Sequence, residues 1–174
     1  MAKKTLTFLY IILFIVLVYF LQLFVVDTKT LFGVKPNLIL ITVIVVSLWY
    51  GVYTGTIFAF IIGVITDFVF GSTTGMFTIA YTITGAITGI INTNYRKENK
   101  LSLIYVTLIF TFVFELIQYI EYLILTGVYS SFFYLLKQVI VSSILNVTIV
   151  VIVYGIIYKI MEKFESNLRR DSAI

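Results

Sequence analysis

Long apolar runs dominate the chain and constrain its fold more than any single motif. Of the 174 residues, 61% are hydrophobic and only 11% are charged. Apolar runs of about 18 or more residues with few charges are typical of transmembrane helices. The hydrophilic stretches between these runs are too short to form a soluble domain. We therefore expect an all-α integral membrane protein with a single polytopic domain over residues 1–174.

Short polar breaks divide the chain into six apolar runs, which predict a bundle of six transmembrane helices at about 5–26, 37–50, 53–71, 75–93, 101–126 and 132–159. Lys and Arg are enriched in cytoplasmic loops. Placing both termini in the cytoplasm leaves only three basic residues outside, Lys29, Lys35 and Lys137. The net charge of +4 then reflects topology and anionic lipid, with no indication of nucleic acid binding.

The second run is unusually short. Residues 37–50 would form about 21 Å of helix, less than the roughly 30 Å of the hydrocarbon core. The sequence leaves two interpretations of this run: it extends backwards along the chain, or it thins the bilayer.

Six small residues and one acid recur every four positions, at Gly51, Gly55, Ala59, Gly63, Asp67, Gly71 and Gly75. Each four-residue step drifts by about 40° around a helix, so the seven positions cannot share one face. We expect a shorter seam for helix packing or partner binding, which we name the glycine seam: Gly55, Ala59, Gly63 and Asp67. Gly71 and Gly75 would form the following hairpin. Small residues in the fourth run predict that the third and fourth runs pack as a tight antiparallel pair.

Asp67 is an acid within an apolar run, where a charge is costly and needs a partner or a function. One interpretation is that it accepts hydrogen bonds from the open N–H groups that begin the fourth run, around Thr74 and Gly75. The alternatives are a polar anchor for a partner or ligand, and a proton relay.

Further polar residues lie in the outer halves of the expected helices. Together with Asp67 they form what we name the outer polar cluster: Asp67, Glu115, Gln118, Glu121 and Lys137. Lys137 could pair with Glu121 or Glu115 in an interior salt bridge. Alternatively, the excess of acids could bind a cationic ligand or a basic residue of a partner. In the sixth run, Gln138, Ser142 and Asn146 again step by four.

Catalytic and cofactor sites are not indicated by the sequence. The chain contains no Cys and no His, which excludes Ser-His and Cys-His catalysis and the usual zinc sites. The glycines lack the lysine and context of a phosphate-binding loop. Asp67 is the only aspartate within an expected helix, so a pair of intramembrane aspartates is also excluded. We expect a protein that is not an enzyme and carries no metal or cofactor.

The stretch from Lys35 to Asn92 resembles the rod shape-determining protein MreD family. The resemblance rests on the order and spacing of four features. A Pro36–Asn37 entry leads into the second run, a Gly-x-x-x-Gly turn follows at Gly51 and Gly55, a Gly-x-x-x-Asp lies at Gly63 and Asp67, and a second Gly-x-x-x-Gly lies at Gly71 and Gly75. Chain length, six runs and a short basic tail agree with it.

This resemblance implies a non-enzymatic scaffold of the bacterial cell-elongation machinery in the cytoplasmic (inner) membrane. It implies a bitopic MreC-like partner and, indirectly, peptidoglycan synthases and an MreB-like filament. The chain could also form a homo-oligomer. From the residues, we expect the glycine seam or the outer polar cluster to receive a segment of the partner.

Two other functions fit the layout less well. The substrate-binding subunit of an energy-coupling-factor vitamin transporter is also small, basic and six-spanned. Such subunits dock through small residues four apart on the first span, whereas the first run here contains no Gly, Ala or Ser. A proton- or lipid-handling protein that uses Asp67 and the acids of the fifth run is the second alternative.

Overall fold

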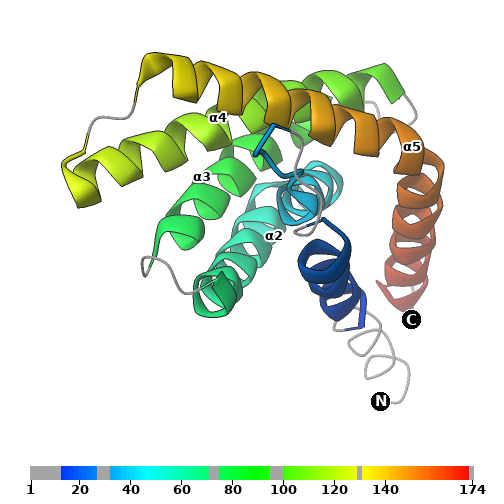
Figure 1. Ribbon diagram of the computed structural model, residues 1–174. Coiled ribbons are helices and arrows are strands. Elements are labelled where there is room, and N and C mark those ends of the chain that lie inside the picture. Colours follow the sequence, from blue (N-terminus) through cyan, green and yellow to red (C-terminus); the bar gives the residue numbers. More distant parts are fainter. Residues whose placement is uncertain (1–12, 27–31, 71–74, 95–99, 129–130, 173–174) are drawn as a thin grey trace.

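The computed structural model describes residues 13–26, 32–70, 75–94, 100–128 and 131–172. Helices are the regular elements throughout these ranges, and no strand occurs in them (Figure 1). An N-terminal helix (Leu13–Phe24) ends in the π-helical segment η1 (Gln22–Val26). It is followed by α2 (Leu38–Phe70), α3 (Met76–Ile90), the 3-10 segment η2 (Ile91–Asn94), α4 (Lys100–Thr126) and α5 (Phe132–Ser172).

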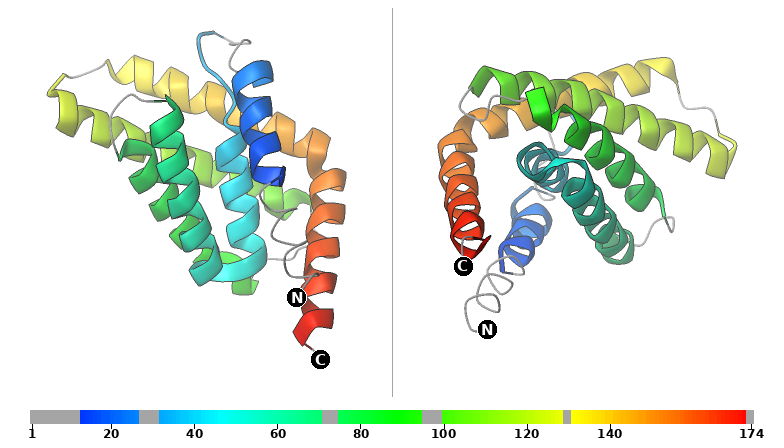
Figure 2. Two further views of the ribbon diagram at one scale, coloured as in Figure 1. Left: turned by 90° about the horizontal axis from the view of Figure 1, so that it is seen from below. Right: turned by 180° about the vertical axis from the view of Figure 1, so that it is seen from behind.

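Helix α2 reverses its direction at Gly51. Gly51 has φ 82° and ψ −177°, a backbone conformation that is essentially restricted to glycine. A Cβ added to Gly55 would lie 2.7 Å from the Cα of Ser47, although a straight helix would separate these residues by about 12 Å. The two arms of α2, residues 38–50 and 52–70, therefore fold back on each other as a hairpin (Figure 2).

The side-chain amide of Asn92 stabilises this reversal. It donates a hydrogen bond to the backbone carbonyl of Leu48, just before the break at Gly51. Backbone groups at a helix break lose their usual partners and need others. A residue of η2 therefore supplies a hydrogen-bond donor to the backbone at the turn of the hairpin.

The first arm of α2 forms the core of the protein. From Ile39 to Trp49 every side chain except that of Thr42 is buried, and Leu40, Val43, Ile44 and Leu48 have no exposed surface. A helix that is apolar on all sides needs other elements around it. Neighbouring helices therefore surround this short arm.

Helix α3 packs closely against α2 with opposite direction. A Cβ on Gly63 would lie 2.5 Å from the Cα of Thr78, and one on Gly89 would lie 2.5 Å from the Cα of Val52. Contacts that pair a late residue of one helix with an early residue of the other define an antiparallel arrangement. Glycine permits this approach because backbone atoms take the place of side chains.

The remaining helices enclose the α2–α3 unit. The N-terminal helix lies on α2, where the Tyr19 hydroxyl donates to the carbonyl of Ile62 at 2.8 Å and bonds the Thr66 hydroxyl at 2.6 Å. Helix α4 and the first part of α5 run side by side as a second layer across α2 and α3, and the later part of α5 bends away from α4 (Figures 1 and 2). Tyr81 of α3 stacks on Phe114 of α4 with 4.9 Å between ring centroids and joins the two layers.

The expectation of six separate helices needs correction. Five helices are counted in the described residues, because residues 38–50 and 52–70 are joined in α2 without a loop. Three helices are long and apolar enough to cross a membrane: α2, α4 and the part of α5 from Phe132 to Lys159. The N-terminal helix and α3 are apolar but shorter. Helix α5 also continues to Ser172, past the expected end of the sixth run.

We predict that Gly63→Ala lowers the free energy of unfolding by about 1–3 kcal/mol, the usual cost of overpacking a close contact. The new methyl group would press on the backbone of Thr78. The measurement is thermal or denaturant unfolding of the purified protein in detergent.

Gly155→Ala is the matched control for this prediction. Gly155 is also helical, but nothing lies within 4 Å of its added Cβ, so we expect no loss of stability. Equal effects of the two substitutions would contradict the close packing of α2 on α3.

Candidate functional site

Asp67 completes the start of helix α3. Its two carboxylate oxygens accept hydrogen bonds from the backbone N–H groups of Phe77 and Thr78, both at 3.0 Å. The Thr78 hydroxyl donates to the same carboxylate. The first N–H groups of any helix lack partners within the helix, and the helix dipole favours a negative charge beside them. Asp67 therefore links the end of α2 to the beginning of α3.

The donors to Asp67 lie further along the chain than the sequence suggested. The expectation named Thr74 and Gly75, and Thr74 lies outside the described residues. Gly75 is the N-cap of α3, has φ 102° and makes no side-chain cap of its own. The second and third amides of the helix, at Phe77 and Thr78, consequently point back to Asp67. Gly71, the other expected hairpin residue, also lies outside the described residues.

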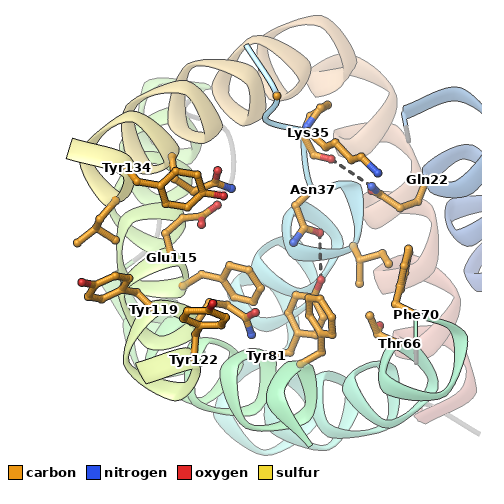
Figure 3. Close-up of a pocket in the computed structure, with 18 residues that line it drawn as sticks. Gln22, Lys35, Asn37, Thr66, Phe70, Tyr81, Glu115, Tyr119, Tyr122 and Tyr134 are labelled. Carbon is orange, nitrogen blue, oxygen red and sulfur yellow. Dashed lines mark hydrogen bonds between the residues drawn. The ribbon is translucent and has the colours of Figure 1, made fainter. Parts of the chain in front are cut away.

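A cavity of about 670 Å³ opens beside this helix start (Figure 3). We name it the aromatic cavity, because seven of its lining residues are Phe or Tyr. Its walls come from the N-terminal helix, the segment before α2, and helices α2 to α5. The lining residues are Gln22, Gly33, Lys35, Pro36, Asn37, Ile39, Thr66, Phe70, Phe77, Tyr81, Phe114, Glu115, Gln118, Tyr119, Tyr122, Tyr134, Leu135 and Gln138.

A buried polar network fixes one wall of the aromatic cavity. Asn37 caps α2 by accepting the N–H of Leu40 at 2.8 Å, and its side-chain oxygen also accepts the Tyr81 hydroxyl at 3.1 Å. The backbone N–H of Asn37 donates to the side chain of Asn146 at 2.8 Å. Asn146 is fully buried and donates in turn to the Thr111 hydroxyl at 3.2 Å. The network thus ties α2, α3, α4 and α5 together at one point.

Gln22 holds the segment that enters α2. Its amide nitrogen donates to the carbonyl of Pro36 at 3.2 Å, and its oxygen accepts the N–H of Leu38 at 2.8 Å. Pro36 and Asn37, which the sequence marked as the entry to the second run, are therefore held by hydrogen bonds to three other helices. Both residues also line the aromatic cavity.

The outer polar cluster is only partly assembled around the cavity. Glu115 and Gln118 line it, and Glu115 faces the polar side chains of Gln138 and Ser142 on α5. Gln118 donates to the carbonyl of Met76 at 3.2 Å and to Glu121 at 3.4 Å. Asp67 and Glu121 do not line the cavity, and neither does Lys137.

The expected salt bridge of Lys137 is not formed within the described residues. Lys137 is exposed, while one carboxylate oxygen of Glu121 has no hydrogen-bond partner among the described residues. Glu115 has only neutral polar groups of α5 beside it. The rotation of α5 explains why the salt bridge is absent. Gln138 faces the cavity, whereas its neighbour Lys137 is exposed and points away from it.

The glycine seam is covered by the chain itself. Gly55 contacts Ser47 of the first arm, and Gly63 contacts Thr78 of α3. Ala59 has no exposed surface. The seam therefore serves internal packing, and of the two partner surfaces expected from the sequence it is the one already occupied.

Several residues of the cavity were not indicated by the sequence, among them Gln22, Tyr119 and Tyr134. A tyrosine or glutamine in an apolar run resembles an ordinary interfacial residue. The four-residue spacing of Gln138, Ser142 and Asn146 was a local pattern that indicated polar residues on one face of α5. Gln138 lines the cavity, and Asn146 belongs to the polar network beside it.

We predict that Asp67→Asn lowers the free energy of unfolding by about 1–3 kcal/mol, the usual cost of leaving buried donors without their charged acceptor. An asparagine has one acceptor oxygen, and its NH₂ group would face N–H donors. Thermal unfolding in detergent measures the effect. Glu121→Gln is the control, since it removes a charge without removing a helix cap; equal losses in both variants would contradict the capping role.

Comparison with protein families matches residues 2–164 of the chain to the family of the rod shape-determining protein MreD. The comparison with curated proteins gives no match, and the comparison with solved structures gives none.

Proposed function

The chain belongs to the family of the rod shape-determining protein MreD, and we propose that it acts in rod shape determination as a non-enzymatic membrane scaffold. The family match covers nearly the whole chain and carries this proposal. It favours a shape-determining role over the alternative of a vitamin-binding transporter subunit, which the sequence also allowed.

The family and the three helices long enough to span a bilayer indicate a membrane protein. We place it in the bacterial cytoplasmic membrane with six crossings and both termini in the cytoplasm. The hairpin at Gly51 supports this topology, because it lets α2 cross twice without a polar loop. The cytoplasmic excess of Lys and Arg supports the orientation. On this orientation, the aromatic cavity lies in the outer half of the membrane.

The partner in this proposal is a bitopic MreC-like protein, through which peptidoglycan synthases and an MreB-like filament would be reached. The glycine seam is covered internally, and the outward face of α4 and α5, which the sequence did not indicate, is the surface that we propose for the partner's helix. Only 17% of the apolar stretch of α5 is buried, compared with 61% for α2. Exposed side chains on this face include Ile144, Ile152 and Ile156.

Contacts between distant helices would make this protein rigid, as a scaffold requires. The close α2–α3 contact, the Asp67 cap and the Asn37–Asn146 network each connect helices that are far apart in sequence. Interactions of this kind hold a surface in one geometry, which is what positioning of other proteins requires.

We predict that a photoreactive amino acid at Ile152 of α5 crosslinks to a bitopic membrane protein in intact membranes. Mass spectrometry of the purified adduct identifies the partner. A photoreactive group at Phe68 of α2, which is 81% exposed on another face, is the matched control and should give no such adduct. Absence of a bitopic protein from both adducts, or retention of a vitamin by the purified protein, would contradict the scaffold.

A further inference from the structure

The aromatic cavity has the size of a small-molecule pocket. Voids in protein interiors rarely exceed the size of a water molecule, whereas pockets for small molecules have about 300–1,000 Å³. At about 670 Å³ the cavity lies within that range. Its lining, many aromatic and apolar side chains with a few convergent polar groups, is also typical of a binding pocket.

Glu115 gives the cavity a negative group that lacks a cationic partner in the described part of the chain. It faces the neutral side chains of Gln138 and Ser142. The two other acids nearby have different roles, since Asp67 caps α3 and Glu121 lies next to Gln118 outside the cavity. Acids at membrane depth are costly without a partner. A cation that enters the cavity would supply one.

Tyrosine side chains occupy the side of the cavity that holds Glu115. Tyr119, Tyr122 and Tyr134 lie on the same side of the cavity as Glu115 (Figure 3). The faces of aromatic rings attract ammonium groups, most strongly where water is excluded. A carboxylate with several tyrosines thus favours an organic ammonium group. The described residues contain no group of three His, Cys, Asp or Glu that could hold a metal ion instead.

Lys35 supplies positive charge on another wall. It reaches the cavity from the segment before α2, while Glu115 reaches it from α4 (Figure 3). A ligand with both an ammonium and an anionic group would match both walls. Phe132 and Phe133 come directly before the lining residue Tyr134 on α5 and are exposed outside the cavity. They offer a place for an acyl chain.

We propose that the aromatic cavity binds the zwitterionic head group of an aminophospholipid, with its ammonium at Glu115 and the tyrosines and its phosphate at Lys35. A free zwitterion such as phosphoethanolamine has the same chemistry, so the test separates the two sources. This inference concerns a site that the scaffold does not use. Its failure would leave the crosslink at Ile152 unaffected.

The test is native mass spectrometry of the delipidated full-length protein with either phosphatidylethanolamine or phosphatidylglycerol. We expect wild type to retain phosphatidylethanolamine in preference to phosphatidylglycerol. Glu115→Gln should weaken this retention about tenfold, the effect of losing one charged hydrogen bond. Glu121→Gln, on the same helix but outside the cavity, should leave it unchanged. Lys35→Gln should weaken it several-fold, whereas Lys137→Gln should not.

Competition with soluble phosphoethanolamine tells whether the head group alone suffices. Displacement of the lipid supports a head-group site, and binding of phosphoethanolamine without any lipid assigns the cavity to a free zwitterion. If Glu115→Gln fails to fold, as judged by thermal unfolding, Tyr134→Ala at the exposed rim takes its place, with weakening of several-fold expected.

Equal retention of the two lipids, or equal effects of Glu115→Gln and Glu121→Gln, would overturn the proposal. It would also be overturned if neither lipid nor phosphoethanolamine binds and carbodiimide labelling of Glu115 is blocked only in membranes that contain the crosslinked partner. That outcome would assign the cavity to a basic side chain of the partner.

Discussion

The close approach of three helical segments, made possible by glycine, is the constraint on which the rest of the structure depends. Gly51 adopts a conformation that other residues rarely adopt, and the two arms of α2 fold together there. Gly55, Gly63 and Gly89 then bring backbone against backbone. Between lipid-embedded helices there is little hydrophobic driving force, so van der Waals contact of this kind is a main source of association.

The same hairpin determines where polar groups meet. Folding α2 at Gly51 brings its beginning, at Asn37, and its end, at Thr66 and Phe70, to the wall of the same cavity. Helix starts expose N–H groups that hydrocarbon cannot satisfy, and Asn37 and Asp67 each cap such a start. Asn146 satisfies the N–H of Asn37 from α5. The aromatic cavity lies where these helix ends converge, and one geometry therefore serves both stability and a binding site.

Features that depend on the spacing of nearby residues could be inferred from the sequence. The apolar runs predicted helices, and their division at Gly51 coincides with the reversal in α2, although the two arms form one continuous element. The family resemblance carried by Pro36 to Gly75 is confirmed by the family match. The sequence did not indicate contacts between helices that are far apart in the chain. The pairing of Asn37 with Asn146 spans 109 positions, and no local pattern indicates it.

The salt bridge expected for Lys137 also shows that the sequence did not indicate which way a helix faces. Charge complementarity suggested a pairing with Glu115 or Glu121, but the rotation of α5 presents Gln138 to the cavity and leaves Lys137 exposed. Helical rotation is set by packing over the whole bundle. A single pair of opposite charges contributes too little to decide it when one of them is exposed.

Spin labels at Thr42 and Ile65 test the closed hairpin of α2 most directly. The natural chain has no Cys, so two introduced cysteines carry the only labels, and pulsed electron resonance in lipid nanodiscs gives their separation. A straight helix would place these positions about 35 Å apart. The closed hairpin predicts one short distance, near the roughly 10 Å spacing of packed helices plus the length of the labels. A distance close to that of the straight helix would contradict it.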